Sequence, residues 1–248
     1  MKHFIRILMF LFAPLFLIAC RDQTKKLPEV TIADTAAKSK DGVNGFARPV
    51  LIDSSQFVIY PIVKEKADID DSYGSGSNSS RRSTTYWNLI FYNTATKQYH
   101  LLDTIKMIIN SYDREDDISG DKTAGAAGLA DRFIFYEITT TDFNKDGELD
   151  TDDPKYLYIT DRSGNNFRKI TPDSLDIQNW HVVKSTGKVL IDAIKDTNHD
   201  KKFDDDDEVI PLVYDLAQGG TAEPIFSTAF KIATKKLFNS KWHERSQK

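Results

Sequence analysis

The chain has 248 residues, of which 40% are hydrophobic and 28% are charged, so it is long enough for one ordinary globular domain or two small ones. Its formal net charge is −4, and loss of the segment 1–19, with Lys2 and Arg6, would leave 31 basic against 37 acidic side chains. Such a chain repels phosphate backbones, so we expect no nucleic-acid partner. Its one cysteine excludes an intramolecular disulfide.

The segment 1–20 has the pattern of a secretory signal segment. Lys2 and Arg6 give a positively charged start, and an apolar run follows from Ile7 to Ala19. As a helix this run would rise only about 20 Å, which is too short for a comfortable membrane span. The length and the flanks instead predict a segment that directs export.

The residues Leu17-Ile18-Ala19-Cys20 resemble the lipobox of bacterial lipoproteins, in which the cysteine thiol receives diacylglycerol and becomes the new N-terminus. Because the only cysteine falls at this place, we favour lipidation of Cys20 over an ordinary signal peptide that ends in cysteine by chance. The resemblance implies a lipid-anchored protein of the cell envelope. Arg21 stands where inner-membrane retention usually requires Asp, which favours the outer membrane in a Gram-negative source.

Residues 21–45 are polar and are expected to form a flexible tether, and residues 46–248 are expected to form a β-rich domain. Short apolar runs rich in Val, Ile, Tyr and Phe alternate there with turn signals, which is typical of strands. Strands are expected at 50–52, 57–63, 86–92, 132–138, 156–160, 181–183, 189–194 and 209–216. The stretch 101–110 is ambiguous, and 230–238 fits either a short helix or a last strand.

An internal repeat is visible among these expected strands. The segment from Trp180 holds four of them, at 181–183, 189–194, 209–216 and 224–226. The later elements recur at 133–138, 156–160 and 167–170, and a third copy lies at 57–63, 86–92 and 99–102. Four antiparallel strands per unit is the layout of a propeller blade.

The segment from Tyr156 to Pro172, YLYITDRSGNNFRKITP, resembles the strand–turn–strand repeats of TolB-type β-propellers. That resemblance implies a scaffold or protein-interaction surface. Only three units fit in this chain, whereas propellers usually have four to eight. The expected fold class is therefore all-β, with about three antiparallel, four-stranded, blade-like units, and a β-sandwich is the alternative.

Residues 142–153 read DFNKDGELDTDD and match the spacing of EF-hand calcium loops, and they also resemble dockerin loops, which often end in Asp. Alternate residues of a tight turn can aim their oxygen atoms at one ion, and Gly147 permits the sharp bend at the sixth place. The alternative is a solvated acidic turn. The expected Ca²⁺ ligands are Asp142, Asn144, Asp146, Glu148 through its backbone carbonyl, Asp150 and Asp153.

Residues 196–207, DTNHDKKFDDDD, repeat this pattern with Lys201 in place of the glycine. A residue other than Gly at that place costs on the order of 1 kcal/mol of backbone strain, so a solvated turn is a stronger alternative here. Glu208 could replace Asp207 as the last ligand. The expected ligands are Asp196, Asn198, Asp200, Lys202 through its backbone carbonyl, Asp204 and Asp207.

Both loops are expected to lie between strands, because Pro154 and the aromatic run after it disfavour the helix that follows an EF-hand loop. One loop begins at Asp142 and the other at Asp196, and this wide separation in the sequence argues against a compact paired module. In the first unit the acidic segment 68–71 has lost the spacing, so no third ion is expected there.

No catalytic motif is recognisable, and the five histidines show no zinc spacing. We therefore expect a non-enzymatic lipoprotein, held at a membrane by its lipid anchor, in which Ca²⁺ has a structural role or supports binding of a protein partner. The alternative is a surface glycan-binding protein or hydrolase stabilised by Ca²⁺. Trp87, Trp180 and Trp242 could stack on sugars, but core packing is the better interpretation.

Overall fold

The computed structural model describes residues 45–52, 55–63, 86–112 and 128–242. All of them belong to one compact unit, Asp41–Lys248. The expected signal segment, Cys20, nearly all of the tether and the acidic segment 68–71 lie outside the described residues.

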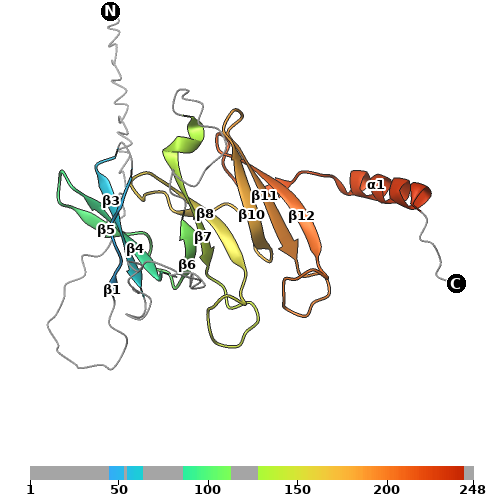
Figure 1. Cartoon of the computed structure of the whole chain (residues 1–248), viewed down its shortest axis with the longest axis horizontal. Helices are drawn as coiled ribbons and strands as arrows, with labels where there is room; N and C mark the ends of the chain where they lie inside the picture. The colour runs from blue at the N-terminus through green and yellow to red at the C-terminus, as the bar shows by residue number, and fades with distance from the viewer. Residues whose placement is uncertain (1–44, 53–54, 64–85, 113–127, 243–248) are drawn as a thin grey trace, which may run out of the picture. The chain divides into compact units, whose positions relative to one another are not determined.

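The described chain folds mostly into three separate antiparallel sheets (Figure 1). Sheet 1 has the order β1-β3-β4-β5, with β2 also paired to β3, while sheet 2 is β6-β7-β8-β9 and sheet 3 is β10-β11-β12-β13. The strands are β1 Gly45–Phe46, β2 Val50–Leu51, β3 Phe57–Val63, β4 Asn88–Asn93, β5 Tyr99–Leu101, β6 Ile108–Tyr112, β7 Phe133–Thr139, β8 Lys155–Asp161, β9 Arg168–Lys169, β10 Asp176–Val183, β11 Lys188–Lys195, β12 Glu208–Asp215 and β13 Glu223–Pro224.

The all-β class and the division into three antiparallel units are confirmed. The ambiguous stretch 101–110 contains the end of β5 and the start of β6, which is the first strand of sheet 2. The stretch 230–238 is helical and belongs to α1, Thr228–Lys241, which begins after Ser227 because the Ser227 hydroxyl accepts a hydrogen bond from the Phe230 amide. Among the described residues, α1 is the one α-helix.

Sheet 2 is buried on both faces. Successive side chains of a strand point to opposite faces, so Ile134, Tyr136 and Ile138 of β7 join a core cluster with Leu89 and Phe91 of sheet 1. Between them, Phe135 points the other way and joins a second cluster, which includes side chains of β11 and β12 in sheet 3. The central strands of sheet 2 therefore read as nearly continuous apolar runs.

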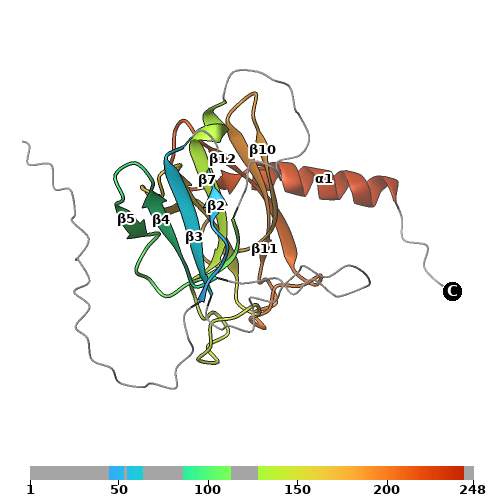
Figure 2. The same ribbon diagram turned by 60° about the vertical axis from the view of Figure 1, so that its left-hand side comes forward.

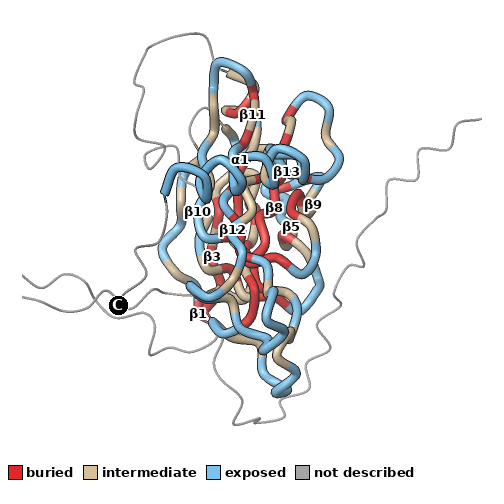
Figure 3. The backbone as a smooth tube through the Cα atoms, turned by 90° about the vertical axis from the view of Figure 1, so that its right-hand side faces the viewer, coloured by how far each residue is buried: buried red, intermediate tan, exposed pale blue. Residues whose placement is uncertain are grey.

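Sheet 3 buries only one face. Along β11 the side chains of Val189 and Ile191 are buried, whereas Leu190 and Asp192 between them are exposed. This alternation is the pattern of a sheet with one solvated face. Figure 3 shows the buried residues gathered in the strands and the exposed ones along the loops and α1.

Specific side-chain contacts join neighbouring sheets. His100 of β5 stacks on Phe91, with ring centroids 5.4 Å apart, and its Nε2 lies 2.9 Å from the carbonyl oxygen of Ser163 in the turn after β8. In the same turn Gly164 has a φ of +78°, and a Cβ there would meet the Phe91 ring at 2.4 Å. Only a residue without a side chain fits so close to the ring.

Between sheets 2 and 3, the indole of Trp180 stacks on Phe135 with centroids 4.8 Å apart, and its Nε1 donates a 3.1 Å hydrogen bond to Glu137. Packing is thus the observed role of Trp180, as expected. The expectation was wrong for Trp242, because its side chain is 70% exposed after the end of α1.

Candidate functional site

The two acidic segments singled out in the sequence occupy matching places in neighbouring sheets. The first acidic loop, 142–153, connects β7 to β8 in sheet 2, and the second acidic loop, 196–207, connects β11 to β12 in sheet 3. Figures 1 and 2 both show the two loops at the same end of their sheets. Each loop carries six carboxyl groups, against one Lys in the first and two in the second, so each concentrates negative charge at this end.

In the first acidic loop the acidic and amide side chains fold back onto the backbone. Asp142 accepts hydrogen bonds from the amides of Lys145 (2.7 Å) and Gly147 (3.0 Å). Asn144 accepts from the Asp146 amide (2.9 Å), and Asp146 accepts from the Glu148 amide (2.8 Å). The side chains at the first, third and fifth places therefore hold the tight turn.

The second acidic loop repeats these bonds place for place. Asp196 accepts from the amides of His199 (2.6 Å) and Lys201 (3.2 Å). Asn198 then accepts from the Asp200 amide and Asp200 from the Lys202 amide, each at 2.9 Å. The two loops thus share one local fold, although the second has Lys201 in place of Gly147.

The backbone of both loops turns through the left-handed region at the same two places. At the fourth place φ is +65° for both Lys145 and His199, and at the sixth place it is +94° for Gly147 and +68° for Lys201. Residues other than glycine rarely adopt this region of the backbone. The strain expected at Lys201 from the sequence therefore agrees with the observed conformation.

The last residue of each loop closes it. Asp153, which is only 2% exposed, accepts from the Phe143 amide (2.7 Å) and from the Asp150 amide (3.3 Å). Asp207 accepts from the Thr197 amide (2.8 Å) and the Asp204 amide (3.4 Å) in the same way. The bond from the Thr197 amide is the largest reason why the pKa of Asp207 lies below its ordinary value.

The two loops are in contact, although their separation in sequence argued against a paired module. The Lys201 ammonium group donates a 2.8 Å hydrogen bond to the backbone carbonyl oxygen of Asn144. The rings of Phe143 and Phe203 lie 5.0 Å apart, centroid to centroid. The distance along the sequence was misleading because neighbouring sheets bring equivalent connections together.

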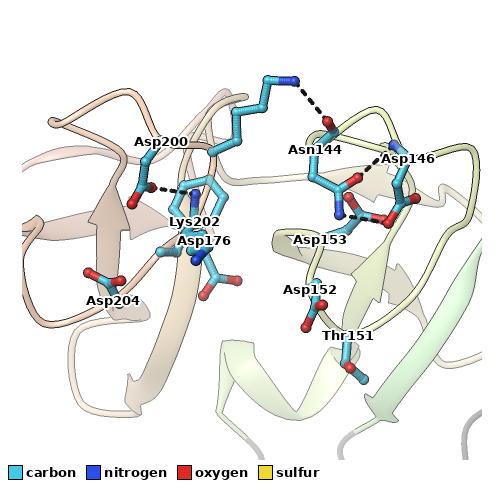
Figure 4. Close-up of a pocket in the computed structure, with 11 residues that line it drawn as sticks. Asn144, Asp146, Thr151, Asp152, Asp153, Asp176, Asp200, Lys202 and Asp204 are labelled. Carbon is cyan, nitrogen blue, oxygen red and sulfur yellow. Dashed lines mark hydrogen bonds between the residues drawn. The ribbon is translucent and has the colours of Figure 1, made fainter.

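A pocket of about 610 Å³ lies between the two loops. Asp146 and Asp152 line it from the first loop, and Asp200 and Asp204 line it from the second (Figure 4). Asp176, at the start of β10, also lines it and is 6% exposed. Burial raises the pKa of Asp176 above its ordinary value, although its carboxylate accepts bonds from the Lys155 amide (2.8 Å) and the Gln178 amide group.

The donor set of each loop fits a hard divalent cation. Carboxylate, side-chain amide and backbone carbonyl oxygens are the ligands that Ca²⁺ takes in proteins, and it needs six to eight of them. Each carboxylate oxygen has two lone pairs, so a bond from a backbone amide leaves one for an ion. Over the described ranges, no three acidic, His or Cys side chains converge closely enough to form a metal-holding group.

Three features of the site were not predicted from the sequence. They are the position of Asp176 at the pocket, the contact of Lys201 with the first acidic loop, and the ring pair Phe143–Phe203. No local pattern signals Asp176, because it reaches the pocket through the pairing of β10 with β11. The two Phe residues did carry a signal, since each is an isolated aromatic residue within a polar segment.

No family model matches the chain, and no curated protein matches it either. In the part of the chain that the structure describes, no helix is both long enough and apolar enough to cross a lipid bilayer.

Proposed function

We propose that this protein is an exported lipoprotein, anchored to the outer membrane through lipidated Cys20, and that each acidic loop binds one calcium ion. The lipobox Leu17-Ile18-Ala19-Cys20 after a signal pattern supports the anchor. The single observation that carries the calcium proposal is the identical hydrogen-bond frame of the two loops, at the places where calcium loops hold their ligands.

The ion would be held by the side chains at the first, third, fifth, ninth and twelfth places and by the carbonyl at the seventh. In the first acidic loop these are Asp142, Asn144, Asp146, Asp150, Asp153 and the carbonyl of Glu148; in the second they are Asp196, Asn198, Asp200, Asp204, Asp207 and the carbonyl of Lys202. A bound cation would offset the mutual repulsion of the carboxylates and stabilise the ends of β7, β8, β11 and β12. The function would be structural, supporting a surface for a protein partner.

We also propose that the three sheets are successive blades of a propeller-like repeat. In each sheet a connection of twelve residues or more joins the second and third strands of the strand order, from β3 to β4, from β7 to β8 and from β11 to β12. The burial of sheet 2 on both faces supports this arrangement, because an inner blade is covered by a neighbour on each side.

Calorimetric titration of the mature chain with Ca²⁺ tests the ion sites. We expect two binding events for the wild type, with one lost in Asp146→Ala and the other in Asp200→Ala, because each variant removes a fifth-place ligand. Asp192→Ala, an exposed change on β11, is the control and should keep both events. The absence of heat and of any Ca²⁺-dependent rise in melting temperature in the wild type would refute calcium binding.

The anchor needs a separate test, namely fractionation of the expressed protein and labelling with a radioactive fatty acid. The wild type should carry the label and sediment with membranes. The Cys20→Ala variant should lose the label, since the acyl chains are attached to this thiol. Label that persisted in Cys20→Ala would contradict the proposal.

A further inference from the structure

The end of the described chain exposes an unusual amount of apolar surface. Of the thirteen large hydrophobic side chains that are exposed in the described ranges, seven lie between residues 225 and 242. No residue of α1 is buried. The seven are Ile225 (40% exposed), Phe226 (43%), Phe230 (53%), Ile232 (51%), Leu237 (60%), Phe238 (60%) and Trp242 (70%). Exposed apolar side chains that cluster in this way mark an interaction surface.

The aromatic side chains are arranged along the helix. Phe226 stacks on Phe230, with ring centroids 5.4 Å apart, and Phe238 stacks on Trp242 at 6.3 Å. Phe230, Ala233 and Leu237 follow one another at intervals of three and four residues, which places them on one side of the helix, and Phe226 joins them from the segment before the helix through its stacking on Phe230. An apolar stripe therefore runs from the residue before the helix cap as far as Leu237, and Phe238 and Trp242 form a separate aromatic pair at the end of α1.

The charge of α1 is opposite to that of the chain. The helix contains Lys231, Lys235, Lys236 and Lys241 and no acidic residue, whereas the chain as a whole has a formal net charge of −4. Lys231 pairs with Glu208 at the start of β12, at 2.7 Å. Lys235, Lys236 and Lys241 are exposed. An acidic protein thus ends its described part in a cationic segment.

We propose that α1 lies in the plane of an anionic lipid surface, with its aromatic and Leu side chains in the headgroup region and its lysines at the phosphates. Such a surface offers apolar depth and negative charge together, which is what this helix can use. Long lysine stems can lie along the apolar layer while their ammonium groups stay in water, and Trp favours this boundary.

A lipid surface fits better than a second copy of the chain. The acidic loops of another copy would complement the lysines, but they offer few apolar side chains to cover Phe238 and Trp242. With 14 residues, α1 would be about 21 Å long, which is too short to span a bilayer and suits a helix that lies along it. A second membrane contact would also complement a lipid anchor, since stable attachment commonly takes two signals.

Quenching of Trp242 by brominated phospholipids tests this proposal on the full chain, reconstituted into vesicles of phosphatidylcholine with or without phosphatidylglycerol. The fluorescence of Trp242 is obtained by subtracting the fluorescence of Trp242→Phe from that of the wild type. This subtraction removes the contribution of the other two tryptophans. We expect several-fold stronger quenching of this signal in the anionic vesicles. The triple variant Lys235→Gln, Lys236→Gln, Lys241→Gln should reduce it to the level of the neutral vesicles.

The matched control is the triple variant Lys97→Gln, Lys106→Gln, Lys195→Gln, which removes the same charge from exposed positions outside α1 and should quench like the wild type. Equal quenching in both kinds of vesicle, or no quenching of Trp242 in anionic ones, would overturn the proposal. Self-association in solution that shields Trp242 from a soluble quencher would overturn it in favour of a second copy. The comparison between vesicles does not depend on lipidation of Cys20 or on Ca²⁺, so its failure is distinct from failure of the proposed function.

Discussion

The ammonium group of Lys201 lies 2.8 Å from the carbonyl oxygen of Asn144, so a cationic side chain of the second acidic loop is bound to the backbone of the first. Lys201 occupies the place that Gly147 has in the first loop, and it keeps a left-handed φ of +68°. A glycine there would relax the backbone but could not reach Asn144. The contact between the loops thus offsets a local strain in one of them.

Substitution of Lys201 can separate these two effects. Lys201→Met keeps the Cβ and the strain and loses the hydrogen bond, so we expect a loss of about 0.5–1 kcal/mol in the free energy of unfolding. Lys201→Gly also loses the bond but is relieved of about 1 kcal/mol of strain, so it should be nearly neutral. Urea denaturation of both variants measures the difference. A glycine variant less stable than the methionine variant would contradict this account.

The turn at Gly164 should be among the positions least tolerant of a methyl group. Gly164→Ala places a Cβ 2.4 Å from the ring of Phe91 in a backbone with φ of +78°. Overpacking of about 1–3 kcal/mol should add to about 1 kcal/mol of backbone strain. Gly219→Ala is the matched control, because φ there is +75° and no atom lies within 4 Å of the added Cβ. Similar melting temperatures for the two variants would show that the turn moves away from Phe91.

The last residue of the first acidic loop should matter more to stability than its counterpart in the second. The carboxylate of Asp153 accepts hydrogen bonds from two backbone amides, and in Asp153→Asn one of these amides faces an NH₂ group in place of a carboxylate oxygen. At this buried site the change should lower the free energy of unfolding by about 1.5–3 kcal/mol. Asp207→Asn makes the same change at a half-buried place, so its cost should be smaller. Chemical denaturation in the presence of a chelator measures both without a contribution from ions.

Asp176 predicts a pH dependence of stability with a definite sign. Burial raises its folded-state pKa above the ordinary value of 3.8, so the folded state holds the proton more tightly than the unfolded state. The contribution of Asp176 to the free energy of unfolding is most favourable below pH 3.8. It is lost as the pH rises through the raised folded-state pKa. The stability of Asp176→Asn relative to the wild type should therefore increase across this interval and then stay constant. The exposed substitution Asp192→Asn, measured over the same pH series, is the control and should show no such rise.

The strands could be predicted because their signals are local. The run from Phe57 to Val63 combines β-branched and aromatic residues, and it forms β3 over those same residues. The stretch 101–110 was ambiguous because its apolar residues fit neither a clear alternation nor a helical period. Tertiary pairing decides the matter there, since Ile108 and Ile109 are held as a strand by Thr139 and Ile138 of β7.

The candidate site was predictable within each loop and not between the loops. The spacing from Asp142 to Asp153 is a property of one short continuous segment, and its hydrogen bonds are local as well. The contact of Phe143 with Phe203 depends on how two sheets lie against each other, which leaves no mark at either residue alone.

The burial of sheet 2 on both faces constrains how this protein can have changed its length in evolution. Deletion of β6 to β9 would uncover one apolar surface on sheet 1 and another on sheet 3. The side chains of these two surfaces differ and are not shaped to pack against each other. A unit gained beyond sheet 3 would cover only the exposed face of that sheet, which is already partly polar along β11. We therefore expect descendants of this architecture to gain units at its outer face while the middle unit is inherited intact.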